Sequence, residues 1–187
     1  MDQHPDAKQT DQTPTPSSGR TDWQAVGARI DELVDMVASE NTEAFDRKLV
    51  ADLLASGLKL LPDGRDRGEL KLMTAAFKEL RYAYRVFGRY PHAHKVTIFG
   101  SARTPEDHPD YVSCVDFSRL MAEAGWMVIT GAGDGIMKAG HVGPGKSASF
   151  GVAIRLPFET TANTVIHGDE KLIHFRYFFP RKQMFLS

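Results

Sequence analysis

The sequence predicts an α/β fold in which a parallel sheet is covered by helices on both faces and is preceded by a small α-helical region. From residue 95 onwards, short and nearly all-apolar strand patterns alternate with helical patterns, as in parallel sheets that are buried on both sides. Glycine-rich turns follow two of these strands, where such a fold passes from strand to helix. The predicted sheet domain is therefore Rossmann-like.

The composition indicates a globular protein with a sizeable core. The chain has 187 residues, of which 42% are hydrophobic, enough to bury a substantial interior. Lys and Arg number 23 against 24 Asp and Glu, so no overall charge attracts nucleic acid or an anionic membrane. Cys114 is the only cysteine, which excludes an internal disulfide and a cysteine-based zinc site. No apolar run approaches the roughly 18 residues of a membrane helix and no signal pattern is recognised, so we expect a cytoplasmic protein without a membrane partner.

The chain is expected to divide into three parts. Residues 1–21 are rich in Pro, Gln, Thr and Ser with almost nothing to bury, which predicts a disordered tail. Residues 22–92 are expected to form a helical N-terminal extension, and residues 93–187 the N-terminal part of a Rossmann-like domain.

Helical spacing of apolar residues predicts three helices in the extension, over about 22–39, 42–60 and 68–88. Asp22 or Thr21 is expected to cap the first of them. In the third helix, five apolar side chains are expected to face inward: Leu72, Met73, Ala76, Phe77 and Leu80.

A stripe of basic and aromatic side chains ends the extension. Its members are Arg81, Tyr82, Tyr84, Arg85, Phe87, Arg89 and Tyr90. Such a stripe is one way to grip a nucleic acid strand, but a solvated face backed by core aromatics is the more ordinary interpretation, and we do not expect a nucleic acid partner. His92 and His94 have no further ligand nearby in the sequence, so neither a metal site nor a cofactor is expected.

The sheet domain is expected to alternate four strands with helices. The strand patterns cover 95–102, 126–133, 150–157 and 171–175. A helix over 108–126 carries Pro109 in its first turn and Gly125 as its stop, and a second helix opens within 134–142.

The stretch I-T-G-A-G-D-G-I-M, residues 129–137, raises the main functional question. Bare backbone at a helix start favours an anion such as a phosphate, because unpaired N–H groups point at it, and Ser101 and Thr130 add hydroxyls at the same rim. The G-x-G-x-G spacing is neither the dinucleotide fingerprint nor a Walker loop. A tight strand-to-helix turn without a ligand is the alternative interpretation.

Four blocks, over 96–111, 125–140, 149–159 and 171–185, resemble the LONELY GUY (LOG) family in order and spacing, in its longer bacterial form with a helical N-terminal extension. The resemblance covers about 95–187. It implies a Rossmann-like homodimer that binds nucleoside 5′-monophosphates and hydrolyses the bond between the base and ribose 5-phosphate. Several members of that family release active cytokinins in this way.

The resemblance and the glycine-rich turn together give the candidate site. Arg181, in an R-K pair with Lys182, matches the arginine implicated in catalysis, and Ala132 stands where the family usually has the middle glycine of its turn. Pro180 predicts that the helix carrying this pair begins near 178 or 179. The candidate substrate- or phosphate-binding residues are Ser101, Thr130, Gly131, Gly133, Gly135, Met137, Glu159 and Lys182.

One signature of the family is missing. Its P-G-G-x-G-T-x-x-E motif, which supplies a phosphate-binding turn and the catalytic Glu, is expected shortly after residue 185 and is not found. We therefore expect a fragment of a longer protein, with an incomplete sheet, in preference to a truncated member that lacks half of the site. The activity is expected of the full-length form.

Three functions are compatible with the sequence. The favoured one is a phosphoribohydrolase that acts on a cytokinin riboside monophosphate or a purine nucleotide. The same turn would also serve a non-enzymatic nucleotide- or cofactor-binding module, such as a sensor or carrier. Nucleic acid binding through 81–95 is the third.

Overall fold

The computed structural model describes residues 21–155 and 162–186 and confirms the α/β fold. The chain divides into two compact units, Met1–Arg65 and Asp66–Ser187. Almost all of the expected tail lies outside the described residues.

The described part of the first unit contains a pair of helices, α1 (Trp23–Val37) and α2 (Ala44–Lys59). Both agree with the sequence prediction to within about two residues. Asp22 caps α1, because its carboxylate accepts the N–H groups of residues 24 and 25. Arg47 of α2 joins the two helices through a hydrogen bond of 2.9 Å to Asp35.

The second unit begins with α3 (Arg67–Phe87), whose C-terminal half supplies most of its core contacts. Ala83, Val86 and Phe87 are buried there. The inward orientation expected for Leu72 and Phe77 is wrong, since these side chains are 40% and 49% exposed. Leu72 precedes the segment of α3 that packs on the core. Phe77 lies about 100° around the helix from Ala76, the buried residue that precedes it.

Four parallel strands form the sheet of this unit, in the order β1-β2-β3-β4. Their bounds are β1 (Lys95–Thr97), β2 (Met127–Thr130), β3 (Ser149–Ile154) and β4 (Leu172–Phe175). The four predicted strands are confirmed, although β1 is shorter than expected. The helices between and after them are α4 (Pro109–Glu123), α5 (Ile136–Val142) and α6 (Phe178–Met184), so α6 begins where Pro180 predicted.

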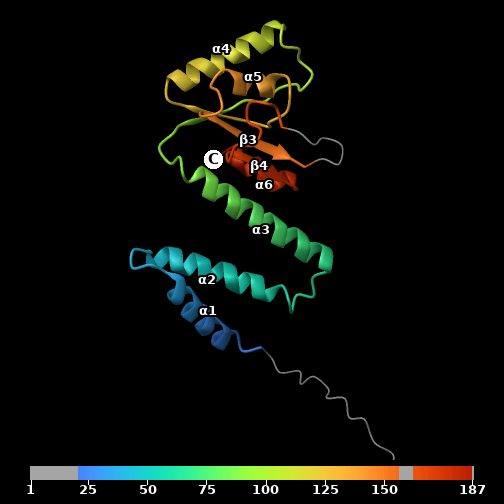
Figure 1. Ribbon diagram of the computed structural model, residues 1–187. Helices are drawn as coiled ribbons and strands as arrows, with labels where there is room; N and C mark the ends of the chain where they lie inside the picture. The colour runs from blue at the N-terminus through green and yellow to red at the C-terminus, as the bar shows by residue number, and fades with distance from the viewer. Residues whose placement is uncertain (1–20, 156–161, 187) are drawn as a thin grey trace, which may run out of the picture. The chain divides into compact units, whose positions relative to one another are not determined.

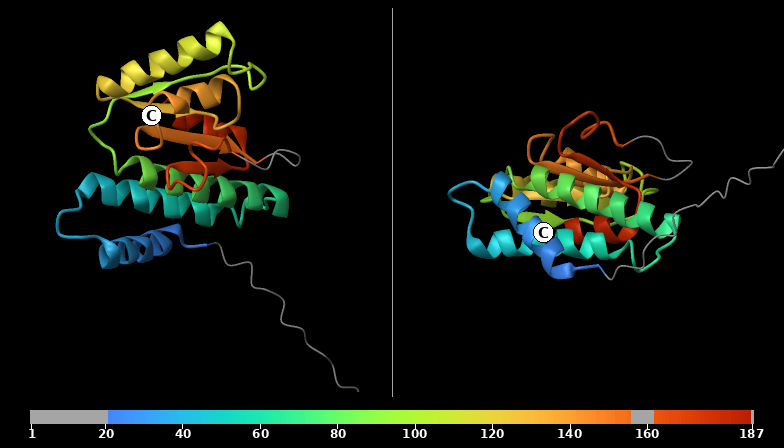
Figure 2. Two further views of the ribbon diagram at one scale, coloured as in Figure 1. Left: turned by 45° about the horizontal axis from the view of Figure 1, so that its top comes forward. Right: turned by 90° about the horizontal axis from the view of Figure 1, so that it is seen from below.

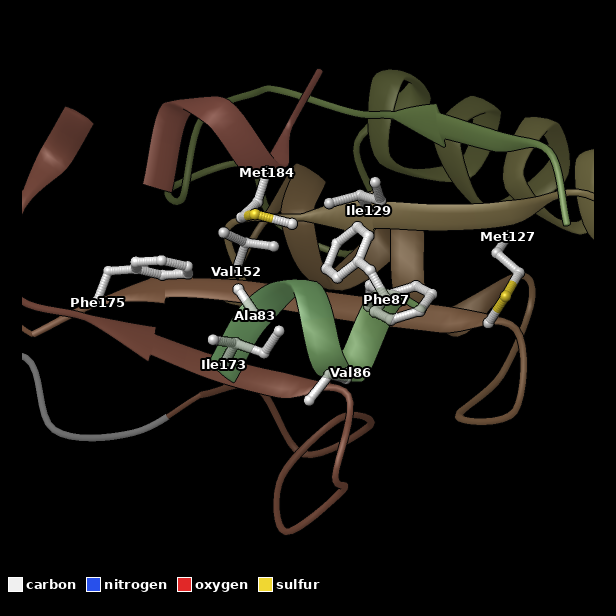
Figure 3. Close-up of a cluster of buried hydrophobic side chains, with 10 residues drawn as sticks. Ala83, Val86, Phe87, Met127, Ile129, Val152, Ile173, Phe175 and Met184 are labelled. Carbon is white, nitrogen blue, oxygen red and sulfur yellow. The ribbon is translucent and has the colours of Figure 1, made fainter. Parts of the chain in front are cut away.

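Helices cover both faces of this sheet, α4 and α5 on one side and α3 and α6 on the other (Figure 1 and Figure 2). The core on the second side joins Phe87 of α3, Ile129 of β2, Val152 of β3, Ile173 of β4 and Met184 of α6 (Figure 3). These five residues lie far apart in sequence, so their close packing holds the strands and the two helices in fixed positions.

The basic and aromatic stripe is divided between core and surface. The ring centroids of Phe87 and Tyr90 lie 4.4 and 5.3 Å from that of Phe150, so these two rings pack against the core and are not free to stack on bases. Arg89 forms an ion pair with Glu170. None of the helices in the described residues has the length and apolar character needed to cross a membrane.

Candidate functional site

Two loops meet at the carboxyl ends of β1 and β2. The first contains Ser101, and the second is the glycine turn, residues 131–135. The N–H of Ile136 donates to the carbonyl oxygen of Ser101 over 3.0 Å. Gly135 has φ +59°, and a Cβ there would collide with that same carbonyl. The contact between the loops therefore requires glycine at this position.

The glycine turn is shaped from beneath by Thr130. Its hydroxyl accepts the N–H of Ala132 over 3.0 Å, and Ala132 has φ +65°, a conformation that favours glycine. The middle glycine that the resemblance leads one to expect would suit this position without strain. The sequence suggested that the Thr130 hydroxyl lies at the rim of the site. Thr130 is instead completely buried, so its hydroxyl supports the turn from the interior.

A buried polar network continues from Thr130 to His141 and Asn163. Nε2 of His141 lies 3.0 Å from the Phe150 carbonyl oxygen and 3.0 Å from the Thr130 hydroxyl. The amide nitrogen of Asn163 lies 3.1 Å from Nδ1 of His141 and donates to the carbonyl oxygen of Gly133 over 3.0 Å. The network thus links α5 to the backbone of the glycine turn.

The contacts fix His141 as the neutral tautomer with its proton on Nε2. A carbonyl oxygen can only accept, so Nε2–H donates to Phe150, and Nδ1 accepts from Asn163. The amide oxygen of Asn163 is occupied by the N–H groups of Val165 and Ile166. That oxygen lies 3.4 Å from Nδ1, farther than the amide nitrogen at 3.1 Å, and burial is the largest cause that lowers the pKa of His141.

Stability is expected to fall as the pH falls below about 6.5, the ordinary pKa of histidine. Because the folded pKa of His141 is depressed, the unfolded chain binds more protons in this window, and the free energy of unfolding decreases by up to about 1.4 kcal/mol per pH unit. Above that pH the neutral His141 side chain makes its full contribution to the free energy of unfolding. Urea unfolding between about pH 5 and 8 measures this slope.

The test variant is His141→Gln, whose side chain cannot titrate. His174→Gln is the matched control, because burial also lowers the pKa of His174. The slope should shrink most in His141→Gln. An unchanged slope in that variant would show that His141 does not titrate on unfolding.

Arg181 and Met137 reach the glycine turn from two different helices. A Cβ on Gly131 would lie 2.8 Å from Nη2 of Arg181 and 2.7 Å from the sulfur of Met137, and one on Gly133 would lie 2.6 Å from the Met137 methyl. The bare Cα atoms of these two glycines therefore make room for the protein's own side chains, which differs from the open approach to a ligand that the sequence suggested.

The Arg181 side chain is bonded to β3 just beyond the point where the pairing of β2 with β3 ends. The pairing of β2 with β3 ends at Thr130 and Gly151, which leaves the carbonyl oxygen of Val152 without a partner on β2. Nε of Arg181 donates to this oxygen over 2.8 Å, and the guanidinium carbon lies 5.1 Å from the Phe185 ring centroid.

The guanidinium of Arg181 has no ion-pair partner among residues 21–155 and 162–186. The side chain is half-buried, and burial lowers its pKa. An arginine nevertheless stays charged at neutral pH. A half-buried cation in such surroundings attracts an anion, because an uncompensated charge is costly to remove from water.

The glycine turn also carries free donors. The N–H groups of Gly133, Asp134 and Gly135 reach no acceptor in the part of the chain that the structure describes. Such successive N–H groups beside a cation are the usual components of an oxyanion or phosphate site.

The structure brings most of the predicted site residues to this corner, namely Ser101, Gly131, Gly133, Gly135, Met137 and Arg181. The hydroxyl of Ser101 accepts the N–H of Arg103. Lys182 is exposed, and Glu159 lies outside the described residues.

A metal site is absent from the described residues. No group of three His, Cys, Asp or Glu side chains among them could hold a metal ion. The candidate site is therefore built, within residues 21–155 and 162–186, from backbone donors and one guanidinium.

Sequence patterns gave no sign of His141 and Asn163. His141 stands in a helical pattern and Asn163 in a stretch typical of a loop, T-A-N-T-V. Neither periodicity nor spacing reveals a buried polar pair that is assembled from two such segments. The surroundings of Arg181 could not be predicted from the sequence either, because they depend on which side chains the fold brings near it.

Comparison with known proteins supports a nucleotide-related fold. A sequence model of the SLOG cluster4 family matches residues 93–166, a range that holds both loops and the buried network but ends before Arg181. No curated protein matches the chain. Residues 93–166 are therefore similar to a LOG-like SLOG grouping of Rossmann-like modules, and the match does not extend to the specific LOG family.

Proposed function

We propose that the sheet domain binds a nucleoside 5′-monophosphate at the glycine turn and, where the P-G-G-x-G-T-x-x-E signature is also present, hydrolyses its base–ribose bond. The phosphate accepts hydrogen bonds from the free N–H groups of residues 133–135 and pairs with Arg181. The single observation that carries the proposal is the half-buried guanidinium, without an ion-pair partner among the described residues, next to Gly131 of the turn that carries those donors. The planar fork of an arginine matches a phosphate in two places at once.

Hydrolysis makes a further demand on the site. Cleavage of a base–ribose bond passes through an oxocarbenium-like sugar, which needs a carboxylate and a positioned water near C1′. The resemblance assigns that carboxylate to the P-G-G-x-G-T-x-x-E signature, which residues 1–187 do not contain. Binding and hydrolysis are therefore separate parts of the proposal and need separate readouts. A purine nucleotide or a cytokinin riboside monophosphate is the proposed substrate, and a homodimer the proposed assembly.

The second candidate function is a nucleotide-binding module without catalysis, such as a sensor. The match to the SLOG cluster4 family, and not to the LOG family itself, favours it. It uses the same phosphate contacts and differs only in the absence of turnover.

Titration calorimetry with AMP and with adenosine, together with chromatography of the released base, tests both functions. The proposal expects AMP to bind at least about tenfold more tightly than adenosine, because one or two charge-assisted hydrogen bonds to the phosphate are each worth about 1.5–3 kcal/mol. Release of adenine, or of the base of isopentenyladenosine monophosphate, supports the hydrolase. Saturable binding without release supports the module, and equal affinities would remove the phosphate site.

Gly131→Ala is expected to weaken AMP binding by about tenfold or more, while the free energy of unfolding changes by only about 1 kcal/mol. The new methyl group falls 2.8 Å from Nη2 of Arg181 and 2.7 Å from the sulfur of Met137. Both are ends of flexible side chains, so the guanidinium moves and the fold survives. Calorimetry and urea unfolding give the two quantities.

Gly57→Ala is the matched control, since a Cβ there meets nothing within 4 Å. It lies in α2 and should leave AMP affinity unchanged while adding up to about 1 kcal/mol of stability. Unchanged AMP affinity in Gly131→Ala would mean that the position of Arg181 does not matter to the ligand.

A further inference from the structure

A second candidate site lies in the same unit, in an open cleft between α3 and the segments that follow β3 and β4. The cleft has a volume of about 720 Å³, within the range of small-molecule sites. Helix α3 lines one side, and Arg155, His174 and Arg176 line the other. Arg181 and the glycine turn are not part of its wall, so the cleft is distinct from the site described above.

The wall of the cleft is strongly cationic. Five basic side chains line it against one carboxylate, that of Glu79, and the five are Arg67, Lys71, Lys78, Arg155 and Arg176. Within the described residues none of the five forms an ion pair. Burial and the nearby Arg155 lower the pKa of His174, so its imidazole adds no charge at neutral pH. Like charges that line the same cleft repel each other, and an anion of matching charge relieves that repulsion.

Glu79 supplies the second, independent observation. One of its carboxylate oxygens accepts the N–H of Arg176 over 2.9 Å. The other, Oε2, is buried and has no hydrogen-bond partner among the described residues. A buried carboxylate oxygen without a donor is costly. Because Glu79 lines the cleft, a rotation of its carboxylate toward the cleft would let a hydroxyl or amino group of the occupant satisfy this oxygen.

We propose that this cleft binds a small metabolite that carries two phosphate groups and free hydroxyl groups. The phosphates pair with the five cations, and a hydroxyl of the same molecule donates to Oε2 of Glu79. Two phosphate groups together carry about −3 to −4 at neutral pH, which balances five positive charges less one negative charge. A sugar bisphosphate and a nucleoside diphosphate share this chemistry.

Titration calorimetry with three probes on the whole chain tests the proposal. Fructose 1,6-bisphosphate and ADP carry phosphates and hydroxyls, whereas pyrophosphate carries the charge without a carbon-bound hydroxyl. All three are measured in the unchanged protein and in Arg181→Ala, so that binding at the glycine turn is removed. We expect saturable binding of at least one of the first two probes that persists in Arg181→Ala. Binding of the sugar bisphosphate alone identifies a sugar site, and binding of ADP alone a nucleotide site.

Two substitutions separate the roles of charge and of Glu79. Arg155→Ala should weaken binding of the hydroxyl-bearing probe by about fivefold, as expected for one partly exposed charge pair. Glu79→Gln keeps the acceptor for Arg176 but replaces the free oxygen with a donor, so it should weaken that probe by about threefold or more while pyrophosphate binds equally or more tightly. Arg85→Ala is the matched control, because Arg85 lies on the same helix outside the cleft, and it should change nothing.

Four results would overturn the proposal. The first is no saturable binding of any probe, and the second is binding that disappears in Arg181→Ala, which would assign it to the glycine turn. The third is tighter binding of all three probes to Glu79→Gln, which would mean that the cleft recognises only the charge of the ligand and that Glu79 binds no hydroxyl group. The fourth is an effect of Arg85→Ala as large as that of Arg155→Ala, which would show that the positive charge of the protein surface attracts the probes without a specific site in the cleft.

Discussion

Arg181→Ala is expected to lower the affinity for AMP by about tenfold to a hundredfold and to leave the fold intact. The change removes a charge-assisted partner of the phosphate, which is worth about 1.5–3 kcal/mol. Within the protein the described hydrogen bond of the half-buried Arg181 side chain goes to the Val152 carbonyl oxygen, so little of the fold depends on it. Titration calorimetry gives the affinity, and circular dichroism reports on the fold. In a protein that also carries the P-G-G-x-G-T-x-x-E signature, the same change should abolish release of the base.

Lys182→Ala and Arg181→Lys are the controls for this result. Lys182 is the neighbouring cation and is exposed, so its loss should reduce affinity by less than about threefold through screened, long-range attraction. Arg181→Lys keeps the charge but not the planar fork, and it should recover only part of the affinity. If Arg181→Ala binds AMP as tightly as the unchanged protein does, Arg181 has no part in the site.

Gly135→Ala is expected to lower the free energy of unfolding by more than about 3 kcal/mol. Two costs add. Alanine at φ +59° and ψ −131° adopts a conformation that costs about 1–3 kcal/mol, and its methyl group collides with the backbone carbonyl of Ser101, which cannot move aside as a flexible side chain does. Urea unfolding monitored by circular dichroism measures the change.

Gly145→Ala separates these two costs. Gly145 has a similar φ of +69°, but a Cβ there meets nothing within 4 Å. It should therefore cost only about 1–2 kcal/mol. Equal losses in Gly135→Ala and Gly145→Ala would contradict the close contact between the two loops.

The fold could be predicted because its signals are local. Strands that are buried on both faces appear as short apolar runs, as V-I-T and F-G-V-A-I do. Helix ends are marked by residues whose chemistry acts on adjacent backbone, such as Asp22 before α1, Pro109 at the start of α4 and Gly125 after it. Errors arose where the burial of one helix face had to be chosen, as for Phe77.

The site could be predicted only in part. The glycine turn was found from its own sequence pattern and Arg181 through a resemblance, and the structure places the two in contact with each other. The burial of Thr130 and its link to His141 depend on α5 packing over β2, which no local pattern encodes. The cleft beside Glu79 likewise joins α3 to residues about a hundred positions later. Long-range assembly of polar groups leaves no periodic trace in a sequence.

The central claim is that the glycine turn and Arg181 hold the phosphate of a mononucleotide. A crystal structure of the protein with AMP tests it most directly. We expect the phosphate oxygens within about 3.2 Å of an Arg181 Nη atom and of the backbone nitrogens of residues 133–135. AMP bound elsewhere with this corner empty, or a phosphate that touches neither group, would contradict the account.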